Sequence, residues 1–280
     1  AAATVLYPNS RMGNSGLSWE TTKTFNAGID FGILNNRING NLDVYLAKTT
    51  GLLLQRNLPK ISGYVNVYAN MGETQNRGIE LTINSKNIVT RNFTWATSLV
   101  FSWNRNEIKD LYGDKKDDLG NRWFIGHPIG VIYDYVKEGI WQEDEIARGD
   151  HKNHDPVAKA GDLKLKDVNG DHKIDDNDRV ILGQTSPKWN GGLTNTFTYK
   201  NLTLNIFIQT TQGLMKDNAL LAMAGDEMGR RNSIVKIGYW TPENKSNKWR
   251  SLCKNSNPHG YGFPQKASYT RLKDVTLSYT

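Results

Sequence analysis

The sequence predicts an all-β fold, namely part of a transmembrane antiparallel β-barrel with long extracellular loops, and three observations predict it. Segments of about ten residues alternate apolar with polar side chains, which is the two-residue period of a strand. The connections between these segments alternate between short and long. The composition, with 26 Gly, 12 Tyr and 8 Trp in 280 residues, fits a turn-rich β protein better than a helical one.

Seven segments carry the alternating pattern. In the first, Phe25, Ile29 and Ile33 share one face, while Asn26 and Asp30 share the other. This alternation is typical of a strand that meets two different environments, one on each face. The seven predicted strands cover residues 24–33, 38–46, 79–84, 93–103, 192–200, 202–209 and 269–280.

The connections give the stronger indication of architecture. A soluble sandwich would mostly use connections of a few residues at both ends of its sheets. Outer-membrane barrels instead join their strands by short periplasmic turns and long extracellular loops. Here the short turns fall at 35–37, 87–92 and 200–201, and the long connections at 50–77, 105–191 and 210–268. The pattern predicts that the region 105–191 is extracellular.

Aromatic residues at the two ends of the strand 93–103 provide a length check. About ten residues at ~3.3 Å each, tilted by ~40°, rise roughly 25 Å, which is the height of the apolar band of a barrel. Phe93 and Trp95 would then mark the periplasmic edge, and Phe101 and Trp103 the outer edge. An ordinary half-buried sheet, in which the same rings fill a core, is the alternative that this pattern leaves open.

Several motifs in order along nearly the whole chain resemble one family. They include "LSWETTKTFNAGIDFGILNNRINGNLDVYLAKTTGLLL", "NMGETQNRGIELTIN", "HPIGVIYDYVKEGIWQ", "GDLKLKDVNGDHKIDDNDRVILGQTSPKWNGGLTNTFTYKNLTLNIFIQ", "YWTPEN" and "ASYTRLKDVTLSYT". Together they resemble the C-terminal half of the barrel in the SusC/RagA family of TonB-dependent transporters of Bacteroidota.

This resemblance implies a large barrel in the cell outer membrane with an N-terminal plug, covered by a surface lipoprotein of the SusD type. It implies import of oligosaccharides or peptides, driven by the inner-membrane TonB complex. On this basis residues 1–280 form part of the barrel domain. The plug, the segment that contacts TonB and the final strands are expected to lie outside the sequence.

A calcium-type loop, "DVNGDHKIDDND", spans residues 167–178. Its spacing offers six oxygen ligands, which suits a hard cation such as Ca²⁺. The apolar Ile174 is expected to anchor the loop, and His172 replaces the usual glycine at a position that needs a left-handed backbone. Because the flanking segments are predicted to be extended, we expect calcium to act as a structural clamp; a solvated turn without an ion is the alternative. The predicted ligands are Asp167, Asn169, Asp171, the Lys173 carbonyl, Asp175 and Asp178.

Three tryptophans in the predicted extracellular loops have polar neighbours and are candidates for contact with cargo: Trp123, Trp141 and Trp240. Flat aromatic faces beside hydrogen-bonding groups commonly bind carbohydrates and peptides. The alternatives are that each ring packs its own loop or contacts the lipoprotein.

Other classes of function find little support. The net charge is +7, but the cations are interspersed with acids and form no stripe, so nucleic acid is not an expected partner. No nucleophile, phosphate-binding or zinc-protease motif is present, so an enzyme is not expected. The main alternative to a transporter is a secreted, calcium-stabilised β-sandwich that binds glycans, and a glycoside hydrolase is the third class.

Overall fold

The computed structural model describes residues 9–219, 238–252 and 256–280. The chain divides into two compact units. The first, here called the barrel unit, comprises Ala1–Gly130, Ser186–Gly213 and Ser268–Thr280. The second, the loop unit, comprises Val131–Thr185 and Leu214–Ala267.

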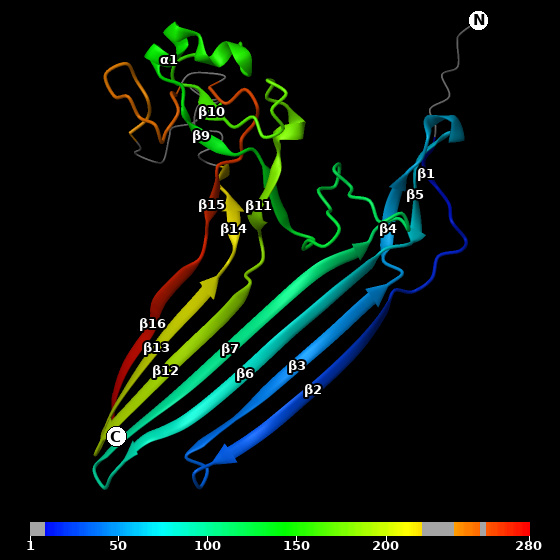
Figure 1. The fold of residues 1–280 in the computed structure, drawn as a ribbon. Helices are drawn as coiled ribbons and strands as arrows, with labels where there is room; N and C mark the ends of the chain where they lie inside the picture. Colours follow the sequence, from blue (N-terminus) through cyan, green and yellow to red (C-terminus); the bar gives the residue numbers. More distant parts are fainter. Residues whose placement is uncertain (1–8, 220–237, 253–255) are drawn as a thin grey trace, which may run out of the picture. The chain divides into compact units, whose positions relative to one another are not determined.

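The barrel unit is built on one seven-stranded sheet with the order β16-β13-β12-β7-β6-β3-β2 (Figure 1). Every neighbouring pair is antiparallel, and the strands follow one another across the sheet in chain order. The sheet therefore confirms the seven predicted strands. Their bounds are β2 Thr21–Ile33, β3 Ile38–Thr50, β6 Glu73–Val89, β7 Phe93–Asp110, β12 Trp189–Tyr199, β13 Leu202–Gln212 and β16 Tyr269–Tyr279.

Short turns join β2 to β3, β6 to β7 and β12 to β13, all at the same end of the sheet (Figure 1). The first turn reverses the chain through three consecutive residues with positive φ: Leu34 at 53°, Asn35 at 54° and Asn36 at 60°. Asparagine tolerates this left-handed backbone, which explains why an Asn-rich segment makes the turn. The predicted alternation of short turns and long connections is confirmed.

One face of the sheet is apolar across its strands. In one row Ile29 pairs with Leu42, Leu42 with Leu81, and Leu81 with Phe101. Ile29 is 65% exposed, so this face carries a large apolar surface that the chain itself does not cover. The other face is polar; its rows include Asp43, which pairs with Glu80. A sheet with one apolar and one polar face is what a barrel wall between lipid and a wet interior requires.

Aromatic rings lie at both ends of the apolar face. Trp95 stacks on Phe197, with 5.7 Å between ring centroids, near the short turns. Near the other end Phe101 and Trp189 lie 5.8 Å apart. This placement agrees with the aromatic residues predicted at the periplasmic and outer edges of the apolar band, here called the periplasmic and the outer aromatic girdle.

The remaining elements of the barrel unit are β1, which precedes β2, and the elements β4, η1 and β5 of the connection between β3 and β6. The strand β1 pairs parallel with β5, and β5 pairs antiparallel with β4. The bounds are β1 Asn9–Met12, β4 Leu53–Asn57, η1 Lys60–Ser62 and β5 Tyr64–Asn70.

The loop unit consists of short elements inserted between the long strands. Three two-stranded antiparallel sheets, β8 with β11, β9 with β10, and β14 with β15, form its framework. The helix α1 begins with a capping box from Gln142 and ends at Gly149, whose φ is 80°. The bounds are β8 Val131–Asp134, β9 Lys137–Ile140, α1 Glu143–Arg148, η2 Asp150–Asn153, β10 Leu163–Leu165, η3 Asp176–Asp178, β11 Val180–Gln184, β14 Met215–Asp217 and β15 Pro264–Lys266.

The long connection expected at 105–191 differs from the prediction in two respects. The strand β7 continues to Asp110, and β12 begins at Trp189, so the connection is shorter at both ends. Much of it is folded, and together with residues from the connection between β13 and β16 it forms the buried core of the loop unit. This core consists of Tyr135, Ile140, Leu163, Leu165, Ile174, Trp240, Tyr261 and Phe263.

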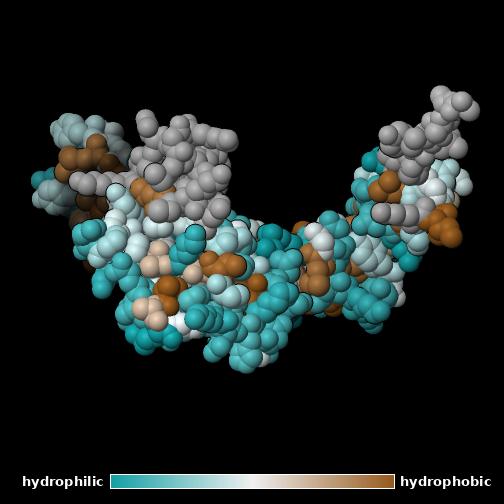
Figure 2. All heavy atoms as spheres, turned by 90° about the horizontal axis from the view of Figure 1, so that it is seen from above, coloured by the Kyte–Doolittle hydropathy of each residue, from teal (hydrophilic) through white to brown (hydrophobic). Residues whose placement is uncertain are grey.

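Figure 2 shows the molecule from above; on the side seen there, hydrophilic residues prevail and the apolar ones form small, separate patches. Within the described residues, no helix is both long enough and apolar enough to cross a membrane.

Candidate functional site

Asp178, the last residue of the predicted calcium loop, holds the two ends of that loop together through its buried side chain. Its side chain is buried, at 0% exposed. One carboxylate oxygen accepts a hydrogen bond from the backbone N–H of Val168 at 2.8 Å, and the other accepts one from the backbone N–H of Asp175 at 2.9 Å. These two charge-assisted bonds tie the start of the loop to its end.

The first half of the loop turns around Asp167. Its two carboxylate oxygens accept hydrogen bonds from the backbone N–H of Gly170 at 2.7 Å and from that of His172 at 2.9 Å. Both donors have positive φ, 75° for Gly170 and 64° for His172. His172 thus adopts the left-handed backbone that the sequence predicted for its position.

The other predicted ligands form local turns. The Asn169 Oδ1 atom accepts from the Asp171 N–H, and the Asp171 Oδ1 atom accepts from the Lys173 N–H, both at 3.0 Å. The Lys173 ammonium lies 2.8 Å from the Asp175 carboxylate and holds the pKa of that carboxyl below its ordinary value. In the described part of the chain no three His, Cys, Asp or Glu side chains lie together as a metal site. Calcium binding therefore stays a prediction.

Ile174 anchors the loop to the loop unit, as predicted. It is 6% exposed and belongs to the buried core. Its backbone N–H donates to the carbonyl of His154 at 3.1 Å, and the extended flanks β10 and β11 lie on either side of the loop in sequence. The loop is therefore part of the packing of this unit.

Two of the three candidate tryptophans are core residues of the loop unit. Trp141 is 1% exposed; the Lys164 ammonium lies 4.5 Å from its ring centroid, and the His154 ring lies 5.5 Å away. Trp240 is 7% exposed, and its Nε1–H donates to Gln142 Oε1 at 3.0 Å. This burial favours the architectural interpretation that the sequence also allowed.

Trp123 lies in the barrel unit and is only half-buried. Its backbone pairs with that of Asp118 through two hydrogen bonds of 2.8 and 2.9 Å. The Asp118 carboxylate also accepts hydrogen bonds from the Tyr112 hydroxyl at 2.5 Å and the Asn121 amide at 2.8 Å. Trp123 is therefore the candidate whose ring is most available for contact with another molecule.

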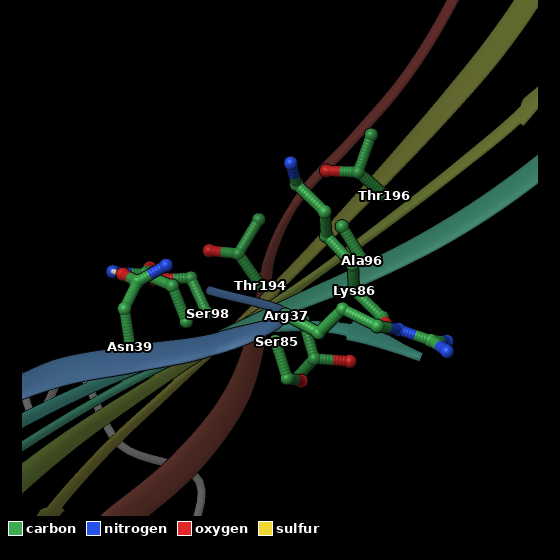
Figure 3. A pocket seen from close by; sticks show the side chains of 10 residues that line it. Arg37, Asn39, Ser85, Lys86, Ala96, Ser98, Thr194 and Thr196 are labelled. Atoms are coloured by element: carbon green, nitrogen blue, oxygen red, sulfur yellow. Dashed lines mark hydrogen bonds between the residues drawn. The ribbon is translucent and has the colours of Figure 1, made fainter. Parts of the chain in front are cut away.

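The polar face of the sheet is hollowed near the short turns (Figure 3). This polar hollow, of about 180 Å³, has two cations and no carboxylate among its lining residues. The Arg37 guanidinium is held there by the carbonyl oxygens of Lys86 and Asn87, at 3.1 and 3.0 Å. The lining residues are Arg37, Asn39, Asn84, Ser85, Lys86, Ala96, Thr97, Ser98, Thr194 and Thr196.

A single antiparallel sheet with one apolar and one polar face, and with short turns alternating with long connections, defines part of an outer-membrane β-barrel. The family model described as "TonB dependent receptor-like, beta-barrel" matches residues 2–280. The chain belongs to this family. The β-sandwich alternative is excluded, because the seven strands pair side by side in one sheet instead of dividing into two.

Individual relatives agree with this assignment. The chain is 31% identical over 278 residues to TonB-dependent receptor P3 of Formosa agariphila, covering 95% of this chain and 28% of that protein. It is 32% identical over 212 residues to TonB-dependent receptor SusC of Bacteroides thetaiotaomicron, covering 71% and 20%. The chain thus spans less than a third of the length of these relatives.

Among solved structures, the fold matches the RagAB peptide importer in its open-open state with a TM-score of 0.74. The sequence identity is 24%, and the match covers 96% of this chain and 29% of the other. At this identity the likeness concerns the fold. Together with the family match and the SusC relative, it confirms the predicted resemblance to SusC/RagA barrels and the location in the outer membrane.

Two features of the candidate sites were missed from the sequence. Glu107, 6% exposed, and the cations around it were not singled out, although "WNRNEIKD" places Arg105, Glu107 and Lys109 at alternate positions and so on one face of the strand. The polar hollow had no sequence signal, because its lining comes from four distant segments.

Proposed function

We propose that this chain is part of the barrel of a SusC/RagA-type TonB-dependent transporter that imports oligosaccharides or peptides across the outer membrane. The observation that carries the proposal is the match of residues 2–280 to the family, together with the barrel-type sheet. In this arrangement the apolar face contacts outer-membrane lipid, and the polar face borders the path of the cargo.

The proposed partners are a SusD-like surface lipoprotein and the TonB complex, the latter reached through parts of the protein outside this chain. The resemblance to SusC and to the RagAB importer supports this assembly. RagAB is a peptide importer, and the resemblance to SusC is equally compatible with glycans. The experiment below therefore tests both classes of cargo. We propose no catalytic function, since the matched relatives are named as TonB-dependent receptors and the matched structure as a peptide importer.

We also propose that the loop 167–178 binds calcium as a structural clamp. The support is the set of oxygen donors at the spacing that Ca²⁺ uses, and the left-handed backbone at His172. Asp178 and Ile174 already fix the end of the loop to the buried core. An ion would neutralise the acids of the first half, with no helix pair for it to open.

Uptake by living cells tests the transport proposal. A strain that lacks the gene would be supplied with the full-length gene and given fluorescent peptides and fluorescent oligosaccharides in parallel. We expect uptake of one class to depend on the gene and to be lost when TonB is inactivated. Uptake of both classes at the same rate with and without the gene would contradict the proposal.

A further inference from the structure

Five cations lie together at one edge of the apolar face of the sheet, at the end away from the short turns. We call this group the basic rim. The register of the strands places its members on the apolar face, because residues two apart along a strand share a face. The basic rim consists of Lys23, Lys48, Arg77, Arg105 and Lys109.

The register also places the basic rim just beyond the outer aromatic girdle. Trp103 pairs with Ile79 on one side and Trp189 on the other, within the apolar band. Two residues further along the strands, Arg77 pairs with Arg105. In the next row Lys23 pairs with Lys48. Each such step moves about 6.6 Å along a strand, so the cations begin where the apolar band ends.

The charge of the basic rim is only partly neutralised. Glu107, 6% exposed, lies 2.6 Å from the Arg105 guanidinium, 2.5 Å from the Lys109 ammonium and 3.6 Å from the Arg77 guanidinium. Lys48 pairs with Glu73 at 2.8 Å. Within these contacts two acids face four cations, and Lys23 adds a fifth positive charge to the basic rim.

The cations keep access to solvent despite these contacts. The side chains of Lys48, Arg77 and Arg105 are 50%, 46% and 52% exposed. A buried carboxylate that holds several exposed cations on one surface pre-orders them without removing their charge. Such a surface is suited to bind an anion from outside the protein.

The charge is confined to one side of the sheet. On β12, β13 and β16 the same face ends in the ring of Trp189 and in the neutral side chains of Gln212, Thr210 and Thr270. The basic rim thus covers only the outer ends of β2, β3, β6 and β7. A general need for charge at the membrane surface would not explain this restriction.

We propose that the basic rim binds the phosphate groups of lipid headgroups in the outer leaflet of the outer membrane. The proposal rests on the proposed orientation, in which the long connections face the outside. At this depth, just beyond the aromatic girdle, a lipid-facing side chain meets headgroups. Arginine matches phosphate with two parallel hydrogen bonds, and lysine binds it as a point charge, so the residue types and the net positive charge both suit a phosphorylated lipid.

The test uses the purified full-length protein in non-ionic detergent and two probes, micelles doped with diphosphorylated lipid A and micelles doped with the same lipid after dephosphorylation. The variant Lys23→Gln, Lys48→Gln, Arg77→Gln removes three cations and leaves Arg105 and Lys109 beside Glu107. Its control, Arg91→Gln, Lys200→Gln, Lys245→Gln, removes the same charge from exposed positions elsewhere. Resistance of the unheated barrel to SDS checks the folding of each protein.

We expect the rim variant to bind the phosphorylated lipid at least about tenfold more weakly than wild type. Fully exposed cations at a membrane surface contribute ~fivefold each, so three of them set an upper bound of roughly a hundredfold. The control variant should bind the phosphorylated lipid like wild type. Wild type should bind the dephosphorylated lipid as weakly as the rim variant binds the phosphorylated one. Equal binding of both lipids by wild type, or an equal loss in the control, would overturn the proposal. The comparison of the two lipids on wild type tests the proposal even if the rim variant does not fold. If wild type binds both lipids equally but takes up cargo normally, lipid binding is refuted and the transport proposal still stands.

Discussion

Replacing Asp178 by alanine should make local opening of the loop 167–178 more frequent. Asp178 is 0% exposed, and its carboxylate accepts hydrogen bonds from the backbone N–H groups of Val168 and Asp175. The alanine variant removes both acceptors and leaves two backbone donors without their partners. Hydrogen bonds to a charged group contribute ~1.5–3 kcal/mol each. Because water can reach part of the opened loop, we expect a loss of about 3 kcal/mol in the local free energy of opening.

Hydrogen exchange followed by mass spectrometry measures this local opening in the detergent-solubilised full-length protein. EDTA should be present throughout, so that a bound ion contributes nothing. A loss of about 3 kcal/mol corresponds to roughly a hundredfold faster exchange at the amides of the loop, with the strands of the sheet unchanged.

The neighbouring carboxylate provides the control. The Asp176 side chain is 86% exposed and makes an ion pair with Arg179 at 3.3 Å. An exposed pair of this kind contributes ~0–1 kcal/mol, so Asp176→Ala should leave the exchange of the loop within about fivefold of wild type. If Asp178→Ala exchanges no faster than Asp176→Ala, the buried carboxylate does not hold the loop and the reasoning is refuted.

Three further predictions concern the candidate sites. Asp167→Ala with Asp171→Ala should abolish the calcium-dependent protection of the loop in hydrogen exchange while the barrel still assembles; identical exchange of the wild-type loop in calcium and in EDTA would contradict the clamp. Trp123→Ala should slow cargo uptake without changing barrel abundance or association with the lipoprotein, and uptake at the wild-type rate would make Trp123 architectural. Trp141→Ala should destabilise the loop unit by ~3–5 kcal/mol, because it empties a site that is 1% exposed; proteolysis of the loop unit in intact cells should increase strongly, and unchanged proteolysis would show that the ring is dispensable for packing.

The strands of the sheet were predictable because each must place apolar side chains on one face and polar ones on the other. Phe25, Ile29 and Ile33 show this period directly, and the observed register pairs Ile29 with Leu42 on the same face. The short turns were predictable from local chemistry, as at Asn35 and Asn36. These signals are local in sequence, so a single chain is enough to detect them.

The loop unit was less predictable because its order depends on contacts distant in sequence. Trp240 belongs to the same buried core as Leu163, and its indole donates a hydrogen bond to Gln142, 98 residues earlier. Neither the spacing nor the polarity of "GYWTPEN" indicates that partner. The same holds for Trp141, whose polar neighbours in sequence suggested exposure although Lys164 and His154 cover its ring. Sequence pattern predicted the anchoring of Ile174, because an apolar residue inside a loop of acids has few other places to go.

The sidedness of the strand connections tests the central claim most directly, since a barrel of this kind must place its long connections outside the cell and its short turns in the periplasm. Epitope tags inserted singly at Lys115, Lys152 and Asn36 of the full-length protein would be probed with antibody on intact cells and again after permeabilisation of the outer membrane. Tags at Lys115 and Lys152 should be labelled on intact cells, and the tag at Asn36 only after permeabilisation. Labelling of Asn36 on intact cells, with no signal from Lys115 and Lys152, would contradict the account.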